Sequence, residues 1–252
     1  MTAALLAALL LLAAGCGSDD PPREPQPPAE AGPDLDDADL WLSFEPDTAG
    51  DVSATYTDAA GGDAVARVVT ANGAALEVVE GPDGGAALAF PPLCPDASGC
   101  ARAMVEVPDS DAIDPADGDF EFGAAVWLAP DQTNGGENIV QKGRFGTEGG
   151  QFKLQVDNVE GHPSCAIRGD GMTTPVLAES DVSIADSRWH RVACRRDAGG
   201  VTIVVDGEES NQAGATGSVE NEWPVRIGAP GVQDGDDQFH GRVDDVYLVI
   251  GS

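Results

Sequence analysis

The sequence predicts an all-β domain made of two packed antiparallel sheets. Short stretches of alternating or β-branched residues recur between clusters of Gly, Asp, Asn and Pro, which is the pattern of strands separated by turns. Beyond residue 38, no window longer than about ten residues keeps a helical apolar period. The 32 glycines and 18 prolines also favour turns. So many strands without alternating helices indicate two stacked sheets.

Each predicted strand is justified by its apolar content and its flanking turn residues. Short runs bounded by Gly, Asp or Pro predict strands at 40–44, 65–69, 76–79, 86–90 and 103–107. Longer apolar or alternating runs predict strands at 120–128, 138–143, 151–156 and 164–168. The last strands are expected at 190–195, 201–205, 225–227 and 242–249.

Residues 189–207 show the clearest local pattern. From Trp189 to Arg196 the side chains alternate, so His190 and Cys194 face the side opposite to Trp189. The segment DAGG at 197–200 is a turn, and an apolar strand at 201–205 returns antiparallel. These residues therefore predict a hairpin.

Several segments, in order, resemble the strands of laminin G-like, concanavalin A-like jelly rolls. They are LWLSFE at 40–45, GGAALAF at 84–90, FEFGAAVWL at 120–128, IVQKG at 139–143, SRWHRVACRRDAGGVTIVVDGEE at 187–209, VRIGAP at 225–230 and FHGRVDDVYLV at 239–249. The resemblance implies one jelly-roll sandwich over residues 39–252. This fold hosts lectins, glycanases, protein-binding modules and passive spacers, so it does not by itself define a function.

The N-terminal end resembles a bacterial lipoprotein signal. An apolar run at 5–14 leads into Ala-Ala-Gly-Cys16, and the run is shorter than the ~20 residues that span a bilayer. The resemblance implies a signal peptide at 1–15 and a lipid on Cys16, which would anchor the protein on the outer face of a bacterial membrane, at the cell surface or on the periplasmic side. The alternative is a buried apolar helix with a free thiol. The polar stretch at 16–38, rich in Pro and acidic residues, is expected to be a disordered stalk.

Charge and cysteine content limit the function further. The chain has 44 acidic and 13 basic residues and a net charge of -31, which disfavours nucleic acid and anionic lipid as ligands. Besides Cys16, four cysteines allow three disulfide connectivities. Cys94 and Cys100 enclose only a turn-like PDASG segment and are natural partners, which leaves Cys165 and Cys194, both in strand-like segments, for each other.

Catalytic patterns are missing from the sequence. A glucanase strand of the Glu-x-Asp-x-x-Glu type does not occur, and the nearest approach is the pair Asp119 and Glu121 at the start of a strand. No Gly-x-Ser-x-Gly, phosphate-binding loop or His-Glu-x-x-His motif occurs either. His190, inside the hairpin, is interpreted as a packed or rim histidine, with a catalytic base as the alternative. We therefore expect no enzymatic activity.

Calcium is the one cofactor that the sequence suggests. Calcium prefers six to eight oxygen ligands, and Asp234, Asp236 and Asp237 offer three carboxylates in one loop. Related jelly rolls often hold a structural calcium where the first and last strands meet, and the resemblance therefore implicates Asp244. The alternative is an acidic loop without an ion.

Tryptophan positions bear on ligand binding because sugar rings stack on aromatic faces. The resemblance implies that Trp41, Trp127 and Trp189 pack in the core. Trp223 lies in a loop or at a strand edge and is the candidate ligand-binding ring; the alternative is that it caps the sandwich.

Together these observations predict a surface-anchored, non-catalytic binding module, with a carbohydrate as the first choice of ligand. A protein-binding adhesion or structural module is the alternative, and a glycan hydrolase is a third. The chain has only four Trp, two Tyr and seven Phe, which argues against a large aromatic sugar platform. Expected partners are a glycan or a surface protein, with no nucleic acid.

Overall fold

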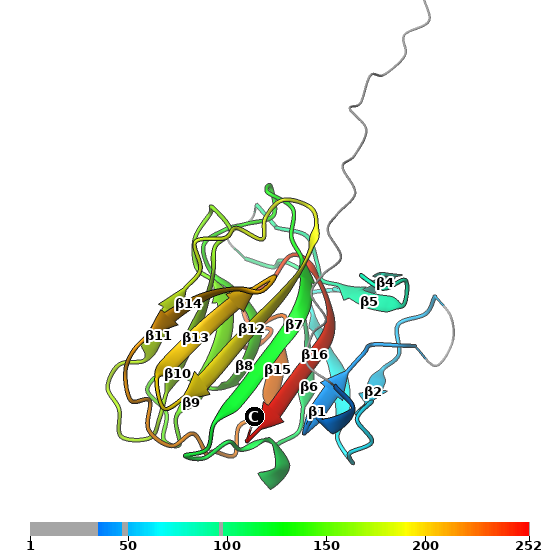
Figure 1. Cartoon of the computed structure of the whole chain (residues 1–252). Coiled ribbons are helices and arrows are strands. Elements are labelled where there is room, and N and C mark those ends of the chain that lie inside the picture. Colours follow the sequence, from blue (N-terminus) through cyan, green and yellow to red (C-terminus); the bar gives the residue numbers. More distant parts are fainter. Residues whose placement is uncertain (1–34, 47–49, 96–97, 252) are drawn as a thin grey trace, which may run out of the picture.

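The computed structural model describes residues 35–46, 50–95 and 98–251, which form two antiparallel sheets packed face to face (Figure 1). The predicted signal peptide at 1–15, Cys16 and most of the stalk lie outside these residues. The helices of the described residues are two short 3-10 turns, Leu35–Asp37 (η1) and Asp111–Ile113 (η2). Within the described ranges, no helix is long and apolar enough to cross a membrane.

The two sheets are named here after their central strands. The β7 sheet has the order β14-β13-β12-β7-β16-β5-β4, and β1 also pairs with β16. Its strands are β1 (Leu40–Leu42), β4 (Glu77–Glu80), β5 (Ala86–Ala89), β7 (Phe120–Trp127), β12 (Trp189–Asp197), β13 (Gly200–Val205), β14 (Glu208–Gln212) and β16 (Arg242–Ile250). The β8 sheet has the order β11-β10-β9-β8-β15-β6-β3-β2. Its strands are β2 (Thr55–Thr57), β3 (Val65–Ala71), β6 (Arg102–Val107), β8 (Glu137–Gly143), β9 (Gln151–Val156), β10 (Pro163–Arg168), β11 (Val176–Glu179) and β15 (Val225–Ile227).

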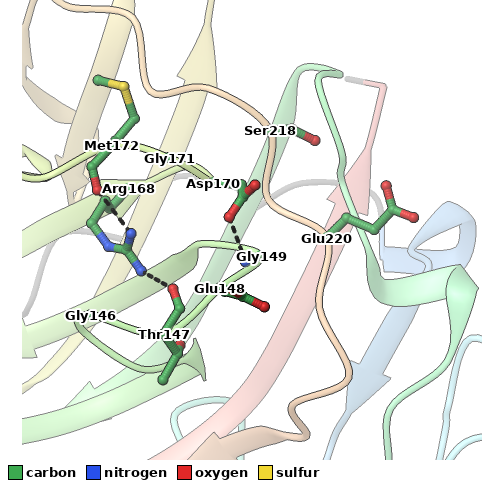
Figure 2. Close-up of a pocket in the computed structure, with 10 residues that line it drawn as sticks. All are labelled: Gly146, Thr147, Glu148, Gly149, Arg168, Asp170, Gly171, Met172, Ser218 and Glu220. Carbon is green, nitrogen blue, oxygen red and sulfur yellow. Dashed lines mark hydrogen bonds between the residues drawn. The ribbon is translucent and has the colours of Figure 1, made fainter.

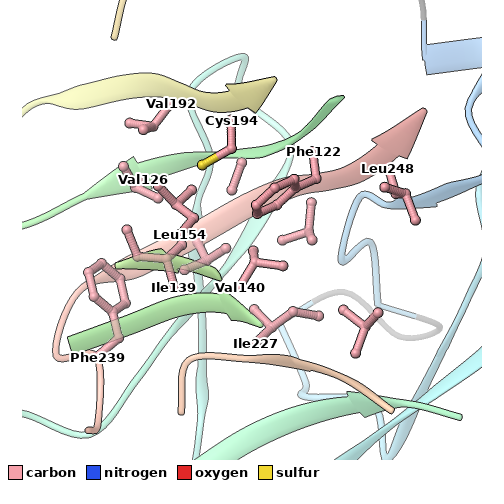
Figure 3. Packing of buried hydrophobic residues seen from close by; sticks show 14 of the residues in the cluster. Phe122, Val126, Ile139, Val140, Leu154, Val192, Cys194, Ile227, Phe239 and Leu248 are labelled. Carbon is pink, nitrogen blue, oxygen red and sulfur yellow. The ribbon is translucent and has the colours of Figure 1, made fainter. Parts of the chain in front are cut away.

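The core lies between the sheets, because the long strands point alternate apolar side chains inward. Figure 3 shows Phe122 and Val126 of β7 facing Leu154 of β9. Phe122 and Phe152, from opposite sheets, pack with ring centroids 4.6 Å apart. Such buried aromatic pairs contribute roughly 0.5–1.5 kcal/mol beyond the area that they bury. The alternation predicted for the hairpin is confirmed, and the side of His190, Val192 and Cys194 is the buried one.

Both predicted disulfides are present. Cys94 and Cys100 are bonded, with their Cα atoms 5.8 Å apart. Cys165 of β10 and Cys194 of β12 join the two sheets through the core, with a Cα–Cα distance of 5.7 Å. Of the three possible connectivities, the structure therefore contains the one that the spacing favoured.

The predicted strands are all present, but three further strands were missed. These are β2 and β11, the two edges of the β8 sheet, and β14, an edge of the β7 sheet. Their burial patterns are largely exposed, so they carry little of the apolar alternation that identifies a strand. The sequence signal therefore fails at these three edge strands because little of their surface is buried.

The core positions expected for Trp41, Trp127 and Trp189 are wrong. All three are only half-buried, and none belongs to the core cluster. Trp127 lies directly opposite Trp189 on the outer face of the β7 sheet. The period of two explains this, since the neighbours Val126 and His190 take the inward side.

Candidate binding site on the outer face of the β8 sheet

On the outer face of the β8 sheet, polar side chains of the central strand β9 are shielded from solvent. In β9, Phe152 and Leu154 point into the core, so Gln151 and Gln155 point outward. Nevertheless Gln151 is only 4% exposed and Gln155 only 5%. Outward-facing polar residues with so little exposure indicate a hollowed face.

A cavity of about 530 Å³ lies on this face. Its floor is made by residues of β8 and β9, and its walls by the loop that follows β8, by Trp223 and by the loop at 230–237. The cavity brings three sequence-predicted residues together: Trp223, Asp236 and Asp237. Its size falls within the range of about 300–1,000 Å³ typical of small-ligand sites.

The floor contains an ordered pair of amides on β8. The Asn138 Nδ2 donates to the Gln141 Oε1 at 2.6 Å, and the Gln141 Nε2 donates to the Gly143 carbonyl. Asn138 is 1% exposed, and within the described residues its Oδ1 has no hydrogen-bond partner. An unpaired buried carbonyl oxygen costs free energy, which the rest of the fold must offset.

The Trp223 wall is held in place by the core. Lys142 of β8 is fully buried, and its Nζ donates to the Trp223 and Asn221 carbonyls, each at 2.8 Å. The same Nζ forms ion pairs with Asp109 and with Asp114, the latter at 3.1 Å. Sequence reasoning missed Lys142, because a lysine in a strand carries no signal for inward orientation.

Two aromatic rings line the cavity. Trp223 is half-buried, and the Arg226 guanidinium lies 5.7 Å from its ring centroid. Phe145, in the loop after β8, is 69% exposed. The sequence shows Phe145 in a glycine-rich loop, but it does not show that the fold places this loop beside β9. Phe145 and Trp223 therefore offer apolar faces at a polar floor.

Charges in the cavity are balanced. The Arg144 Nη2 lies 3.3 Å from an Asp236 carboxylate oxygen, and the Lys153 Nζ lies 3.7 Å from one of Asp237. Burial lowers the pKa of Lys153, although the nearby Asp157 and Asp237 carboxylates oppose that shift. A site with paired charges suits an uncharged polar ligand better than a strongly charged one.

The four predicted calcium ligands do not lie together. Asp236 and Asp237 line the cavity, whereas an Asp234 carboxylate oxygen accepts from the Gly99 backbone N–H at 3.2 Å, and Asp244 lies on β16 of the other sheet. In the described parts of the chain, no group of three or more His, Cys, Asp or Glu side chains could hold a metal ion. Calcium binding stays a prediction.

Asp244 lies on the last strand, β16, two residues before Val246, which pairs with Leu42 of the first strand, β1. It is 6% exposed, and burial, with the adjacent Asp245 charge, raises its pKa to about 8. A Cβ atom placed on Gly81 would lie 2.6 Å from the Asp244 Oδ2, so the Gly81 backbone approaches this carboxylate closely. The Trp41 Nε1 donates to the Asp245 Oδ1 at 2.9 Å.

The residues weighed for catalysis lie elsewhere. Glu121 is on the β7 sheet and accepts a hydrogen bond from the Tyr247 hydroxyl at 2.7 Å. His190 is buried between Asp206 and Asp186, at 2.7 Å and 3.0 Å. Burial disfavours the charged imidazole, but the hydrogen bonds to both carboxylates outweigh it and raise the pKa of His190. This arrangement is a packed, charge-assisted histidine.

Several solved structures similar in fold come from toxins. The binding domain of Paraclostridial Mosquitocidal Protein 1 matches with a TM-score of 0.61 and 13% identity, covering 85% of this chain and 49% of that one. The binding domain of botulinum neurotoxin DC in complex with rat synaptotagmin II matches with a TM-score of 0.59 and 12% identity, covering 85% and 48%. A structure described by the dependence of botulinum neurotoxin type C cell entry on two ganglioside molecules matches with a TM-score of 0.58 and 12% identity, again covering 85% and 48%.

These similarities show the fold, and this chain spans about half the length of those binding domains. Among curated proteins, none matches the sequence closely enough to count as a relative. Residues 103–249 match the family model of laminin G-type domains described as the concanavalin A-like lectin/glucanases superfamily. That match covers more than half of the chain and includes the floor of the cavity and Trp223. The chain therefore belongs to the concanavalin A-like lectin/glucanases superfamily.

Proposed function

We propose that the domain is a non-catalytic glycan-binding module and that the cavity on the β8 sheet is its ligand site. The observation that carries this proposal is an ordered amide floor beside two aromatic rings. Amides such as Asn138 and Gln141 bind sugar hydroxyls, and rings such as Phe145 and Trp223 pack against the C–H faces of a sugar. The balanced charges of the cavity favour a neutral sugar.

The similar toxin domains are compatible with two ligand classes. One is described with gangliosides and another with the protein synaptotagmin II. A protein ligand would usually bury a broad surface of about 800 Å² on each partner. We favour the glycan because the polar, concave floor at Asn138 and Gln141 suits hydroxyl groups rather than a flat protein surface.

A glycan array with the full-length protein tests the proposal. We expect binding to neutral glycans, and a loss of about tenfold or more in affinity for Phe145→Ala and for Trp223→Ala. Leu177→Ala is the matched control, because Leu177 is an exposed apolar residue on the edge strand β11 and does not line the cavity. Its affinity should equal that of the wild type.

Other outcomes would replace the proposal. Binding to no glycan, together with capture of a surface protein that Phe145→Ala abolishes, would favour an adhesion module. Turnover of any glycan would make the domain a hydrolase. Equal losses in Phe145→Ala and Leu177→Ala would remove the cavity as the site.

We also propose a calcium ion at Asp244, separate from the glycan site. Asp244 is buried, forms no ion pair among the described residues, and lies close to Glu45 and Asp245. Since these carboxylates do not form a full ligand group, backbone carbonyls would have to complete the coordination. Calcium should raise the Tm of the wild type over that in chelator, and Asp244→Asn should remove the increase. An equal increase in Asp244→Asn would disprove this site.

A lipid anchor at Cys16 is proposed from the sequence alone. It would display the domain on the outer face of a bacterial membrane, where a glycan or a surface protein would be accessible. The stalk at 16–38 would act as the spacer.

A further inference from the structure

We infer that a second cavity, next to the first, is an additional subsite, so that the ligand is a neutral oligosaccharide chain rather than a single sugar. This inference rests on the proposed glycan-binding function. The second cavity has a volume of about 740 Å³ and lies among the loop at 146–149, the loop at 168–172 and Ser218 and Glu220 (Figure 2). It is large enough for a ligand unit of its own.

The two cavities adjoin. Thr147 lines both of them. Gln151, on the floor of the first cavity, is directly opposite Arg168, which lines the second, in the register of β9 and β10. Phe145 stands at the border, with the Arg168 guanidinium 6.0 Å from its ring centroid. A chain bound in the first cavity would therefore pass Phe145 and enter the second.

The walls of the second cavity are fixed before a ligand arrives. Arg168 is 4% exposed, and its guanidinium donates to the Thr147 carbonyl at 2.7 Å and to the Met172 carbonyl at 3.0 Å, as Figure 2 shows. It thereby ties the loop after β8 to the loop after β10. A pre-ordered wall loses little conformational entropy on binding.

Glycines let the three loops pack backbone against backbone. The Glu220 N–H donates to the Gly149 carbonyl at 2.9 Å. A Cβ atom on Gly149 would lie 2.3 Å from the Glu220 carbonyl oxygen, and a Cβ on Gly169 would lie 2.3 Å from the Thr216 carbonyl oxygen. Any larger residue at Gly149 or Gly169 would push the loops apart.

The side chains of the second cavity indicate the chemistry of its ligand. Glu148, Asp170 and Glu220 provide carboxylate acceptors, and the Gly149 N–H holds the Asp170 carboxylate at 2.9 Å. Carboxylates accept strong, charge-assisted hydrogen bonds from sugar hydroxyls. Met172, which is 38% exposed, adds an apolar contact on the wall opposite Ser218 and Glu220 (Figure 2). With Arg168 included, the lining is still net negative and repels an anionic sugar, so among sugars it suits a neutral unit.

Titration of the full-length protein with disaccharides and hexasaccharides of neutral hexoses and N-acetylhexosamines tests the inference. Hexasaccharides should bind about tenfold or more tightly than disaccharides of the same sugar. The double variant Glu148→Ala/Glu220→Ala, at two exposed side chains, should lose that advantage and keep its affinity for disaccharides. Glu208→Ala/Glu209→Ala on β14 is the matched control, because it makes the same charge change on the other sheet and should bind like the wild type.

The results separate the second subsite from the glycan-binding function on which it rests. Equal affinity for short and long chains would overturn the second subsite while leaving the glycan site intact. An unchanged length dependence in Glu148→Ala/Glu220→Ala would overturn it as well. Tighter binding of uronate chains, or of oligolysine that the double variant abolishes, would overturn the neutral oligosaccharide. If neither the wild type nor Phe145→Ala binds a glycan of any length, the proposed function itself would be refuted.

Discussion

Lys142 connects the core to the candidate site through a single buried ammonium group. Its Nζ contacts two carboxylates, Asp109 and Asp114, and the backbone carbonyl of Trp223. Such a network is costly to break, because removal of one partner leaves buried polar groups without compensation. The position of the Trp223 ring therefore depends on a buried charge that does not line the cavity.

Replacement of this ammonium should destabilise the fold. Lys142→Met should lower the free energy of unfolding by about 3–5 kcal/mol, since Asp114 and the carbonyls lose their donor. Urea unfolding measures the change. Arg195→Met is the control: it breaks a surface pair with Glu209 at 3.1 Å and should cost about 1 kcal/mol or less. Equal effects in both variants would contradict the central role of Lys142.

The raised pKa of His190 predicts how the stability of the fold depends on pH. Because the folded state raises the pKa of His190, its contribution is fully present below about pH 6.5 and declines as the pH rises through the folded value. The pKa of Asp206 is lowered despite burial, through its hydrogen bond from His190, so its contribution is lost in acid.

The His190→Gln variant tests this dependence. Urea unfolding of both proteins should show a stability difference that is largest in mild acid and shrinks toward alkaline pH. The comparison isolates His190 from Glu137, whose pKa burial raises to about 7, and from Asp244. A constant difference across the whole pH range would mean that His190 contributes by packing alone.

At the scale of elements, the central strands were predictable, whereas the edge strands β2, β11 and β14 were not. β7, β9 and β12 bury one face against the opposite sheet, so apolar residues recur at alternate positions of their sequences. The edge strands β11 and β14 are largely exposed and carry polar residues. Alternation also shows which residues share a face, but it does not show whether a given face is inside, as the three outward tryptophans demonstrate.

The disulfides differ in the length of chain that they close, and so should their effects. Cys165→Ala/Cys194→Ala opens a bridge with a sequence separation of 29, which corresponds to about 3–4 kcal/mol in the chain-entropy model. Cys94→Ala/Cys100→Ala opens one with a separation of 6, worth about 2 kcal/mol. Urea unfolding under non-reducing conditions compares them. A larger loss from the short bridge would show that loop entropy is not the main term.

At the scale of the whole molecule, the net charge of -31 hides a local balance. On the outer face of the β8 sheet, Arg226 and Arg67 both pair with Glu106, and Lys153 pairs with Asp237.

The sequence alone indicated Trp223 and Asp236 as site residues, because a loop aromatic and an acidic loop are recognisable. It could not indicate Asn138 or Phe145. Their roles depend on the topology, which places the Asn138 amide on a hollow face and the loop with Phe145 beside it.

The lipid anchor is a prediction about the whole chain. Cys16→Ala should release the protein from the membrane fraction or leave it unprocessed, because the thiol that carries the lipid is gone. Fractionation and mass measurement of the N-terminal peptide provide the readout. Gly17→Ala, next to the lipidated residue, is the control and should fractionate like the wild type. If Cys16→Ala remains with membranes as the wild type does, the anchor is wrong.

The glycine-packed loops around the second cavity also determine how the site could be retargeted. Gly149 and Gly169 tolerate no side chain, and a length change in one loop would disturb its neighbours. A combinatorial library should therefore keep the loop lengths and both glycines and vary only the side chains that face the cavity, such as Glu148, Met172 and Glu220. New specificities would then be sought on an unchanged backbone, as in a scaffold with fixed rather than flexible binding loops.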